Sequence, residues 1–216
     1  MKKQLFLFCA AVMTFACCQA AQKVDEFTTK SGKKVTITCI KHASMEINYN
    51  GTEIQIDPVG FGVQPTTDYN QFPKANIILI THEHKDHFDR EAITCVRTPA
   101  TSIYSNTAVY NMFRNSIPLN NGDSIVYAPD IKIEAVPAYN YTEGHTQFHP
   151  KGRDNGYILT LDGLRIYIAG DTEDIPEMET IKPKVLFPYH YSQTPIAQVS
   201  MKLAGSGIEV RIRDYQ

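Results

Sequence analysis

The chain has 216 residues, of which 43% are hydrophobic and 20% charged, and its formal net charge is −2. This length and apolar content are typical of one globular domain and exclude a wholly disordered or collagen-like chain. No long basic run occurs, which argues against nucleic acid as a partner, because binding its phosphates needs a concentrated cationic surface. A small-molecule substrate, including an anionic one, is compatible with this charge.

Residues 1–20 differ from the rest of the chain. Lys2 and Lys3 precede a short apolar run that reaches Cys18, and Ala20 and Ala21 follow. A basic start, a short apolar stretch and small residues are typical of a secretory signal peptide, and the run is shorter than the ~20 residues of a membrane-spanning helix. We therefore expect cleavage after Ala20, export to the periplasm or the extracellular space, and no membrane span in the mature chain. A lipid anchor on a cysteine near Thr14–Cys17 is the alternative.

We expect residues 21–216 to form a single domain. Alternating and continuous apolar runs predict a hairpin with an Asn50–Gly51 turn and a strand at 75–81 that is buried on both faces. The other strands are predicted at 35–40, 101–104, 124–127, 131–136, 157–161, 164–169, 185–188 and 208–212. Helices are predicted at 91–96, 107–113, 174–181 and 196–203. Two β-rich halves interleaved with helices indicate packed sheets covered by helices.

Two cysteines, Cys39 and Cys95, stay in the mature domain. Each lies in an apolar segment, where a buried thiol is the common outcome. Export permits a disulfide, so the sequence leaves both redox states open.

The segment that follows the buried strand carries three histidines, His82, His84 and His87, together with Asp86. His82 and His84 are two residues apart, so an extended backbone points both rings to one side, as a shared metal ion requires. Asp86 and His87 come after the chain has begun to turn and can face a second ion. The zincin spacing His-Glu-x-x-His is excluded, because Asp86 stands four residues after His82. A surface charge cluster is the alternative interpretation.

Further donors follow other predicted strands. Asp171 comes directly after the strand at 164–169, where a carboxylate can bridge two metals, and His190 follows the strand at 185–188. His145 and His149 lie before them in the chain, and the local spacing does not choose between the two. Imidazole and carboxylate donors shared over two ions indicate an open catalytic site, since a structural zinc site is closed and usually rich in cysteine.

These motifs together resemble the metallo-β-lactamase superfamily of dinuclear metal hydrolases. The match comprises His82-x-His84-x-Asp86-His87, a later histidine, Gly170-Asp171-Thr172 and His190. Within the superfamily, the chain is similar to the branch of L-ascorbate-6-phosphate lactonase-like proteins. That similarity is carried by 41–44, 56–58, 138–140, 149–152 and 156–157, although Lys41 stands where the branch usually has glycine.

The resemblance implies an α/β fold in the form of a four-layer αβ/βα sandwich, with two packed mixed sheets covered by helices. It favours His149 over His145 as the central ligand. It also implies two divalent ions, with Zn²⁺ expected first and Mn²⁺ or Fe compatible with the same donors. The implied ligands are His82, His84 and His149 for the first ion, Asp86, His87 and His190 for the second, and Asp171 as the bridge.

We therefore expect an exported metal-dependent hydrolase in which a hydroxide bound by both ions cleaves a small ester, lactone, amide or phosphoester. Asp86 is the candidate catalytic residue, because it could shuttle a proton to the leaving group. The alternatives are a metal-binding protein without turnover and a metal-dependent oxidoreductase.

Residues around the ligands have supporting roles in this hypothesis. Asp57 is a candidate to hold a ligand imidazole by its free N–H, with turn chemistry before Pro58 as the alternative. His42 is a candidate at the rim of the site, with an ordinary core or edge histidine as the alternative. Lys151 and Arg153 are candidates for binding an anionic group, and Tyr191 is a third candidate substrate-binding residue. The pattern predicts no particular oligomeric state.

Overall fold

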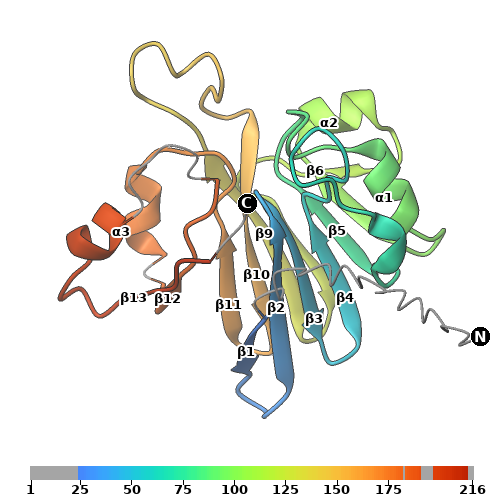
Figure 1. The fold of residues 1–216 in the computed structure, drawn as a ribbon, viewed down its shortest axis with the longest axis horizontal. Coiled ribbons are helices and arrows are strands. Elements are labelled where there is room, and N and C mark those ends of the chain that lie inside the picture. Colours follow the sequence, from blue (N-terminus) through green and yellow to red (C-terminus); the bar gives the residue numbers. More distant parts are fainter. Residues whose placement is uncertain (1–23, 182, 191–196, 214–216) are drawn as a thin grey trace, which may run out of the picture.

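The structure is a computed structural model that describes residues 24–181, 183–190 and 197–213. Two β-sheets pack face to face in it, with short helices at their sides (Figure 1). The predicted signal peptide, residues 1–20, lies outside the described residues. Within them, no helix has the length and apolar character needed to cross a membrane.

The first sheet has seven strands in the order β1-β2-β3-β4-β5-β6-β7. Their bounds are Val24–Thr28, Lys34–Lys41, Ser44–Tyr49, Thr52–Ile56, Ile77–Ile80, Ser102–Ser105 and Ile117–Pro118. Strands β1 to β4 are antiparallel, whereas β4 to β7 are parallel. The two-residue turn Asn50–Gly51, with both residues at positive φ, closes the β3–β4 hairpin. The parallel pairs need longer crossovers, and those from β5 to β6 and from β6 to β7 run through α1 (Arg90–Val96) and α2 (Thr107–Met112).

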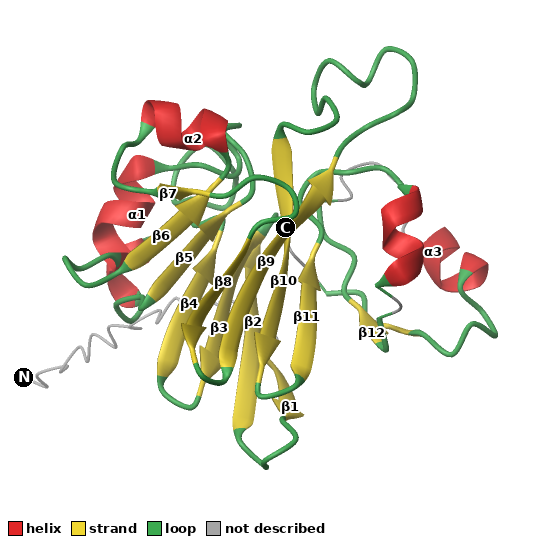
Figure 2. Cartoon of the chain, turned by 180° about the vertical axis from the view of Figure 1, so that it is seen from behind, coloured by secondary structure: helices red, strands yellow, loops and turns green. Residues whose placement is uncertain are grey.

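The second sheet has four antiparallel strands in the order β11-β10-β9-β8. In chain order, β8 to β11 span Ser124–Ala128, Ile131–Ala138, Asp154–Leu161 and Leu164–Ile168. A small parallel sheet joins β12 (Val185–Leu186) to β13 (Glu209–Val210). The loop between β9 and β10 projects beyond both sheets (Figures 1 and 2).

The expected sandwich of two packed sheets is confirmed, and its helices are few and short. Among the described residues, the α-helices are α1 (Arg90–Val96), α2 (Thr107–Met112) and α3 (Ala197–Lys202). Helices α1 and α2 lie against the first sheet, and α3 lies beside the small sheet (Figures 1 and 2). Asp89 caps α1 by accepting hydrogen bonds from the backbone N–H groups of Glu91 and Ala92, as an N-cap residue does.

Two apolar cores hold these layers together. Between the sheets, alternate residues of β2 such as Val35 and Ile37 pack against β9 and β10 residues such as Ile133 and Leu159. On the other face of the first sheet, a second core joins β5 and β6 to both of their helices. Strand β5 contributes to both cores and is buried on both faces, as predicted. Cys39 lies in the first core and Cys95 packs against the second, and both are thiols, not a disulfide.

The differences from the predicted elements are confined to short segments. The helix predicted at 174–181 is a 3₁₀ helix, η2 (Pro176–Thr180), which begins at a proline and has no side-chain N-cap. A second 3₁₀ helix, η1 (Tyr69–Gln71), lies in the loop after β4. Strands β1 and β7 were not predicted, because each lies at an edge of the sheet and pairs with only one neighbour.

Asp25 attaches the C-terminal segment to β1. Its buried carboxylate accepts hydrogen bonds from Arg213 Nε at 2.8 Å and from Arg211 Nη1 at 2.9 Å. These charge-assisted bonds outweigh the effect of burial and hold the pKa of Asp25 below its ordinary value of 3.8.

We expect Asp25→Asn to lower the free energy of unfolding by about 1–3 kcal/mol at neutral pH. The pKa of Asp25 is lower in the folded than in the unfolded chain, so this stabilisation is present above pH 3.8 and is lost as the pH falls through the folded-state value. Urea unfolding at several pH values should show the two proteins converging in acid. Glu26→Gln, on the same strand, is the matched control. A pH-independent difference would contradict this role of the carboxylate.

Candidate metal centre

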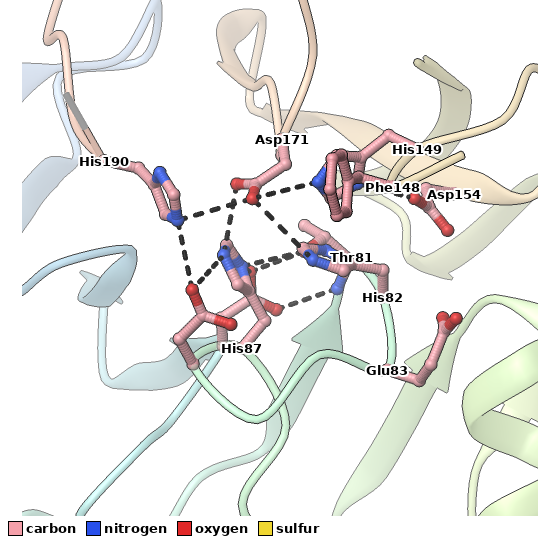
Figure 3. A network of polar contacts seen from close by, with 12 residues as sticks. Thr81, His82, Glu83, His87, Phe148, His149, Asp154, Asp171 and His190 are labelled. Atoms are coloured by element: carbon pink, nitrogen blue, oxygen red, sulfur yellow. Dashed lines mark hydrogen bonds and ion pairs between the residues drawn. The ribbon is translucent and has the colours of Figure 1, made fainter. Parts of the chain in front are cut away.

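Side chains from both sheets converge where strands β4, β5 and β11 end. They form two groups of four donors, and in each group the donor atoms lie within 4.8 Å of one another. One group consists of His82, His84, His149 and Asp171, and the other of His42, Asp86, His87 and His190. The structure therefore brings together all seven predicted ligands and adds His42 to the second group. Figure 3 shows His82, His87, His149 and His190 around Asp171.

The first group is built from the segment after β5 and the loop before β10. The His82 and His84 rings lie 4.6 Å apart between centroids, and the His149 ring lies 4.9 and 4.8 Å from them. His145 lies elsewhere, with 61% of its side chain exposed and Nδ1 at 3.3 Å from Glu173. The geometry thus places His149, and not His145, beside the paired histidines.

Asp171 lies between the two groups. Its Oδ1 is 3.1 Å from His87 Nε2, and its Oδ2 is 3.5 Å from His149 Nε2 and 3.4 Å from His190 Nε2. Gly170, which precedes it, has φ of 69°. A side chain at Gly170 would approach the Asn155 carbonyl of β10 to 3.0 Å and Thr81 Cβ, at the end of β5, to 3.3 Å, so the positive φ and the close packing both favour glycine.

Asp57 holds the His87 ring through Nδ1, the ring nitrogen on the side away from Asp171. Asp57 is fully buried, and its Oδ2 lies 2.8 Å from His87 Nδ1. The backbone N–H and the hydroxyl of Thr81 donate to the same carboxylate at 2.8 and 2.7 Å. The hydroxyl also lies 3.0 Å from His82 Nδ1. Asp57 therefore occupies the position expected for a residue that holds a ligand imidazole, and Thr81 connects it to a second one.

Asp154, which the sequence analysis missed, has the same relation to His149. Its Oδ2 lies 2.9 Å from His149 Nδ1, and it accepts hydrogen bonds from Arg153 Nε and Nη2 at 2.7 and 2.9 Å. The remaining Arg153 nitrogen, Nη1, lies 3.3 Å from Glu83. The guanidinium of Arg153 is thus paired with acids on three of its nitrogens, and its role in receiving an anionic substrate stays a prediction. The sequence signal for the role of Asp154 was its position, five residues after the ligand His149.

Lys151 is also paired. Its Nζ donates to Tyr139 Oη at 3.2 Å and to Glu177 at 3.3 Å. Lys151 and Arg153 line a cavity of about 520 Å³ next to α2, but neither presents an unpaired charge there. Tyr191, the third candidate substrate-binding residue, lies outside the described residues.

The buried polar atoms at the centre fit bound cations. Among the described residues, His82 Nε2 is buried without a hydrogen-bond partner, whereas the buried His87 Nε2 and Asp171 Oδ1 contact each other as an ion pair at 3.1 Å. Leaving a buried polar atom unsatisfied costs about 1–3 kcal/mol, so the orphaned His82 nitrogen calls for a partner of another kind. Imidazole nitrogens and carboxylate oxygens without cysteine suit Zn²⁺, Mn²⁺ or Fe. The donors present therefore fit two divalent ions.

The protonation states of the donor residues differ across the two groups. Burial lowers the pKa of His82 to about 2, which keeps its ring neutral. Burial would also lower the pKa of His87, but the carboxylates of Asp171 and Asp57 overcome this and raise it to about 10. Burial opposes ionisation of Asp171, yet the neighbouring His87 holds its pKa well below the usual range. In the absence of metal, the centre therefore contains a proton on His87 that an ion must displace.

Asp154→Asn should weaken metal binding by the first group about 10- to 100-fold, because His149 would lose the carboxylate that fixes its orientation. Chelator competition measures this affinity. Glu173→Gln is the matched control, since Glu173 contacts His145 Nδ1 outside the centre. Equal affinities for the two variants would contradict the role assigned to Asp154.

Metal loading at pH 8 should release protons from the protein. His87 has a raised pKa of about 10, so it holds its proton at this pH and must lose it to bind an ion. Calorimetric titrations in two buffers of different ionisation enthalpy count the released protons. Release should decrease as the pH approaches 10, and pH-independent binding without release would exclude this protonation state.

The chain has recognisable relatives among known proteins and structures. Residues 36–189 match the family model of the beta-lactamase superfamily domain. A UPF0173 metal-dependent hydrolase of Thermococcus onnurineus is 30% identical over 154 residues, which cover 68% of this chain and 66% of that protein. The chain covers 61% of a similarly named protein of Caldivirga maquilingensis, so it spans about two thirds or less of these curated relatives.

Two solved structures extend this similarity to the fold. A candidate metal-dependent hydrolase from Parabacteroides distasonis is 46% identical, has a TM-score of 0.84, and is matched over 90% of this chain and 100% of that one. Igni18, a metallo hydrolase from Ignicoccus hospitalis, has a TM-score of 0.66 at 22% identity, covering 83% of this chain and 95% of that one. At 22% identity, the similarity to Igni18 shows a shared fold and nothing further.

Proposed function

The chain belongs to the beta-lactamase superfamily, and from this membership we propose that it is a metal-dependent hydrolase with a dinuclear centre. The observation that carries the proposal is the pair of four-donor groups that meet at Asp171. A single structural ion would need only one of these groups. The proposed ligands are His82, His84 and His149 for one ion, Asp86, His87 and His190 for the other, and Asp171 for both.

We place Zn²⁺ first among the candidate ions, with Mn²⁺ or Fe as alternatives. Two such ions would act as Lewis acids and lower the pKa of a shared water toward about 7, giving a nucleophile at neutral pH.

The surrounding residues fix the tautomers of the ligand histidines. Asp57 accepts the Nδ1 proton of His87, and Asp154 accepts that of His149. Thr81 Oγ1 is in reach of Nδ1 of His82. Each contact leaves Nε2 of the ring directed at the centre. It also holds the ring in one orientation before an ion binds, so less rotational freedom is lost on binding.

Asp86 is the proposed proton carrier. Its carboxylate is 36% exposed, whereas that of Asp171 is 11% exposed, so Asp86 can exchange protons with a substrate and solvent. Burial opposes its ionisation, but hydrogen bonds from His190 and His42 hold its pKa well below the usual range. This lowered pKa makes the ionised carboxylate a weak base, so the support for the role of proton carrier is its exposed position at the centre, next to where a leaving group would depart.

The proposed substrates are small lactones and esters, followed by amides and phosphoesters. The support is the likeness of His42-Ala43-Ser44 and Asp57-Pro58 to the lactonase-like branch. We also propose that the protein is exported, on the pattern of residues 1–20. The pairing of Lys151 and Arg153 with acids weakens the main support for an anionic substrate, so we assign no charge to it.

Metal analysis coupled to a hydrolysis screen tests this function. We expect His84→Ala and Asp171→Ala to lose bound metal and to lower hydrolysis of the best lactone, ester, amide or phosphoester at least about 100-fold. His145→Ala, outside both groups, is the control and should match the unmodified protein.

Two results would contradict the proposal. The ligand variants could keep both metal and activity, which would place the centre elsewhere. The metal-loaded protein could also fail to hydrolyse any compound of the screen, which would favour metal binding without turnover.

A further inference from the structure

His42 enters the second donor group from a distant part of the chain. It lies in the turn between β2 and β3, and its Nε2 is 3.1 Å from Asp86 Oδ2. His190 Nε2 lies at the same distance from the same oxygen. The His42 and His190 rings are 4.0 Å apart between centroids, so two imidazole nitrogens converge on one carboxylate oxygen.

The separations of these donor atoms suit a shared ion. Donors bound at about 2.0–2.2 Å are about 3 Å apart at right angles and about 3.4 Å apart in a tetrahedron. The distances of 3.1 Å from His42 and His190 to Asp86 fall within this range. Asp171 adds a further donor, at 3.1 Å from His87 Nε2 and 3.4 Å from His190 Nε2.

Backbone strain singles out the same group. Five non-glycine residues have positive φ among those that the structure describes, and Asn50 and Asp162 lie in tight hairpin turns. The other three are His42 at 48°, Asp57 at 41° and His190 at 54°. Each left-handed residue costs about 1–2 kcal/mol. All three belong to the second donor group or support it, which is where such strain is expected at a functional site.

Residues on both sides of His42 are fixed. Lys41 is 1% exposed, and its Nζ donates to the carbonyl oxygens of Gly60, Val63 and Pro65 at 2.9, 2.7 and 2.9 Å. Ser44 is fully buried and donates to the Asp57 carbonyl at 2.6 Å. The main chain at His42 is thus held in a costly conformation that directs the ring at Asp86. A histidine at the rim of the site would need neither the strain nor these anchors.

From this geometry we propose that His42 binds the second ion directly, as an additional ligand of the centre. The inference rests on the proposed function, because it presupposes a dinuclear site. The second ion then has five protein donors, which are His42, Asp86, His87, His190 and the shared Asp171. The first has four, which are His82, His84, His149 and the shared Asp171. The first ion is consequently the more open of the two.

Two substitutions separate binding of the ion from hydrogen bonding to Asp86. His42→Gly removes the ring and relieves the positive φ, so the metal-free protein should be at least as stable as the unmodified one. His42→Asn also tolerates a left-handed backbone and can donate to Asp86, but its amide is a weak metal ligand. His145→Ala is the matched control.

The measurements are chelator competition for each ion and the absorption spectrum of the Co²⁺-loaded protein. We expect both His42 variants to bind the second ion at least about 10-fold more weakly and to leave the first ion unchanged. The Co²⁺ spectrum should become more intense, as it does when the coordination number falls. Added imidazole should restore the original spectrum of His42→Gly.

If His42→Asn matched the unmodified protein in affinity and spectrum, His42 would only hydrogen-bond to Asp86, and the inference would be wrong. Loss of stability in metal-free His42→Gly with unchanged affinity would also overturn it, by showing a structural role. Failure of the unmodified protein to bind two ions would instead refute the proposed function, so the two failures are distinguishable.

Discussion

The buried carboxylate of Asp57 is the interaction on which the centre depends. A buried charge is costly unless hydrogen bonds satisfy it. Asp57 receives three, from the Thr81 backbone, the Thr81 hydroxyl and His87. Its own N–H donates to the Leu79 carbonyl and continues the β4–β5 pairing beyond the strand. The same residue therefore ties two strand ends together and aims a ligand.

The centre also depends on the packing of the two sheets. Tyr157 of the second sheet donates to the Ile80 carbonyl at 2.8 Å, and the Asn155 N–H donates to the Thr81 carbonyl at 3.1 Å. These contacts join the end of β5 to the start of β10, next to His82 and Asp154. The apolar core between the sheets thus supplies the energy that holds ligands from both of them in place. A loss of core packing would separate the two sets of donors.

The loop after β4 accommodates a buried lysine of β2. Lys41 is 1% exposed, so its ammonium group is buried. Three carbonyl oxygens of the loop satisfy its three donors, which makes the buried charge tolerable. This loop and the one between β9 and β10 flank the centre, and in a shared fold such loops determine substrate specificity.

Much of the fold and of the site was predictable from local sequence patterns. The Asn50–Gly51 turn defined a hairpin, the apolar run at 75–81 defined a strand buried on both faces, and the spacing of His82, His84 and His87 indicated a metal site directly after it. These predictions rest on backbone periodicity and turn chemistry, which act over a few residues.

Only the tertiary structure decided which distant residues join that segment. His145 and His149 are four residues apart and chemically identical, and the difference lies in burial and in the contact with Asp154. Arg153, which the sequence offered as a candidate substrate contact, donates to that acid in the folded chain. His42 reaches Asp86 across 44 positions of sequence because the β2–β3 turn lies next to the end of β4, where Ser44 donates to the Asp57 carbonyl. Sequence spacing determines the local direction of a side chain, whereas the packing of strands determines what it meets.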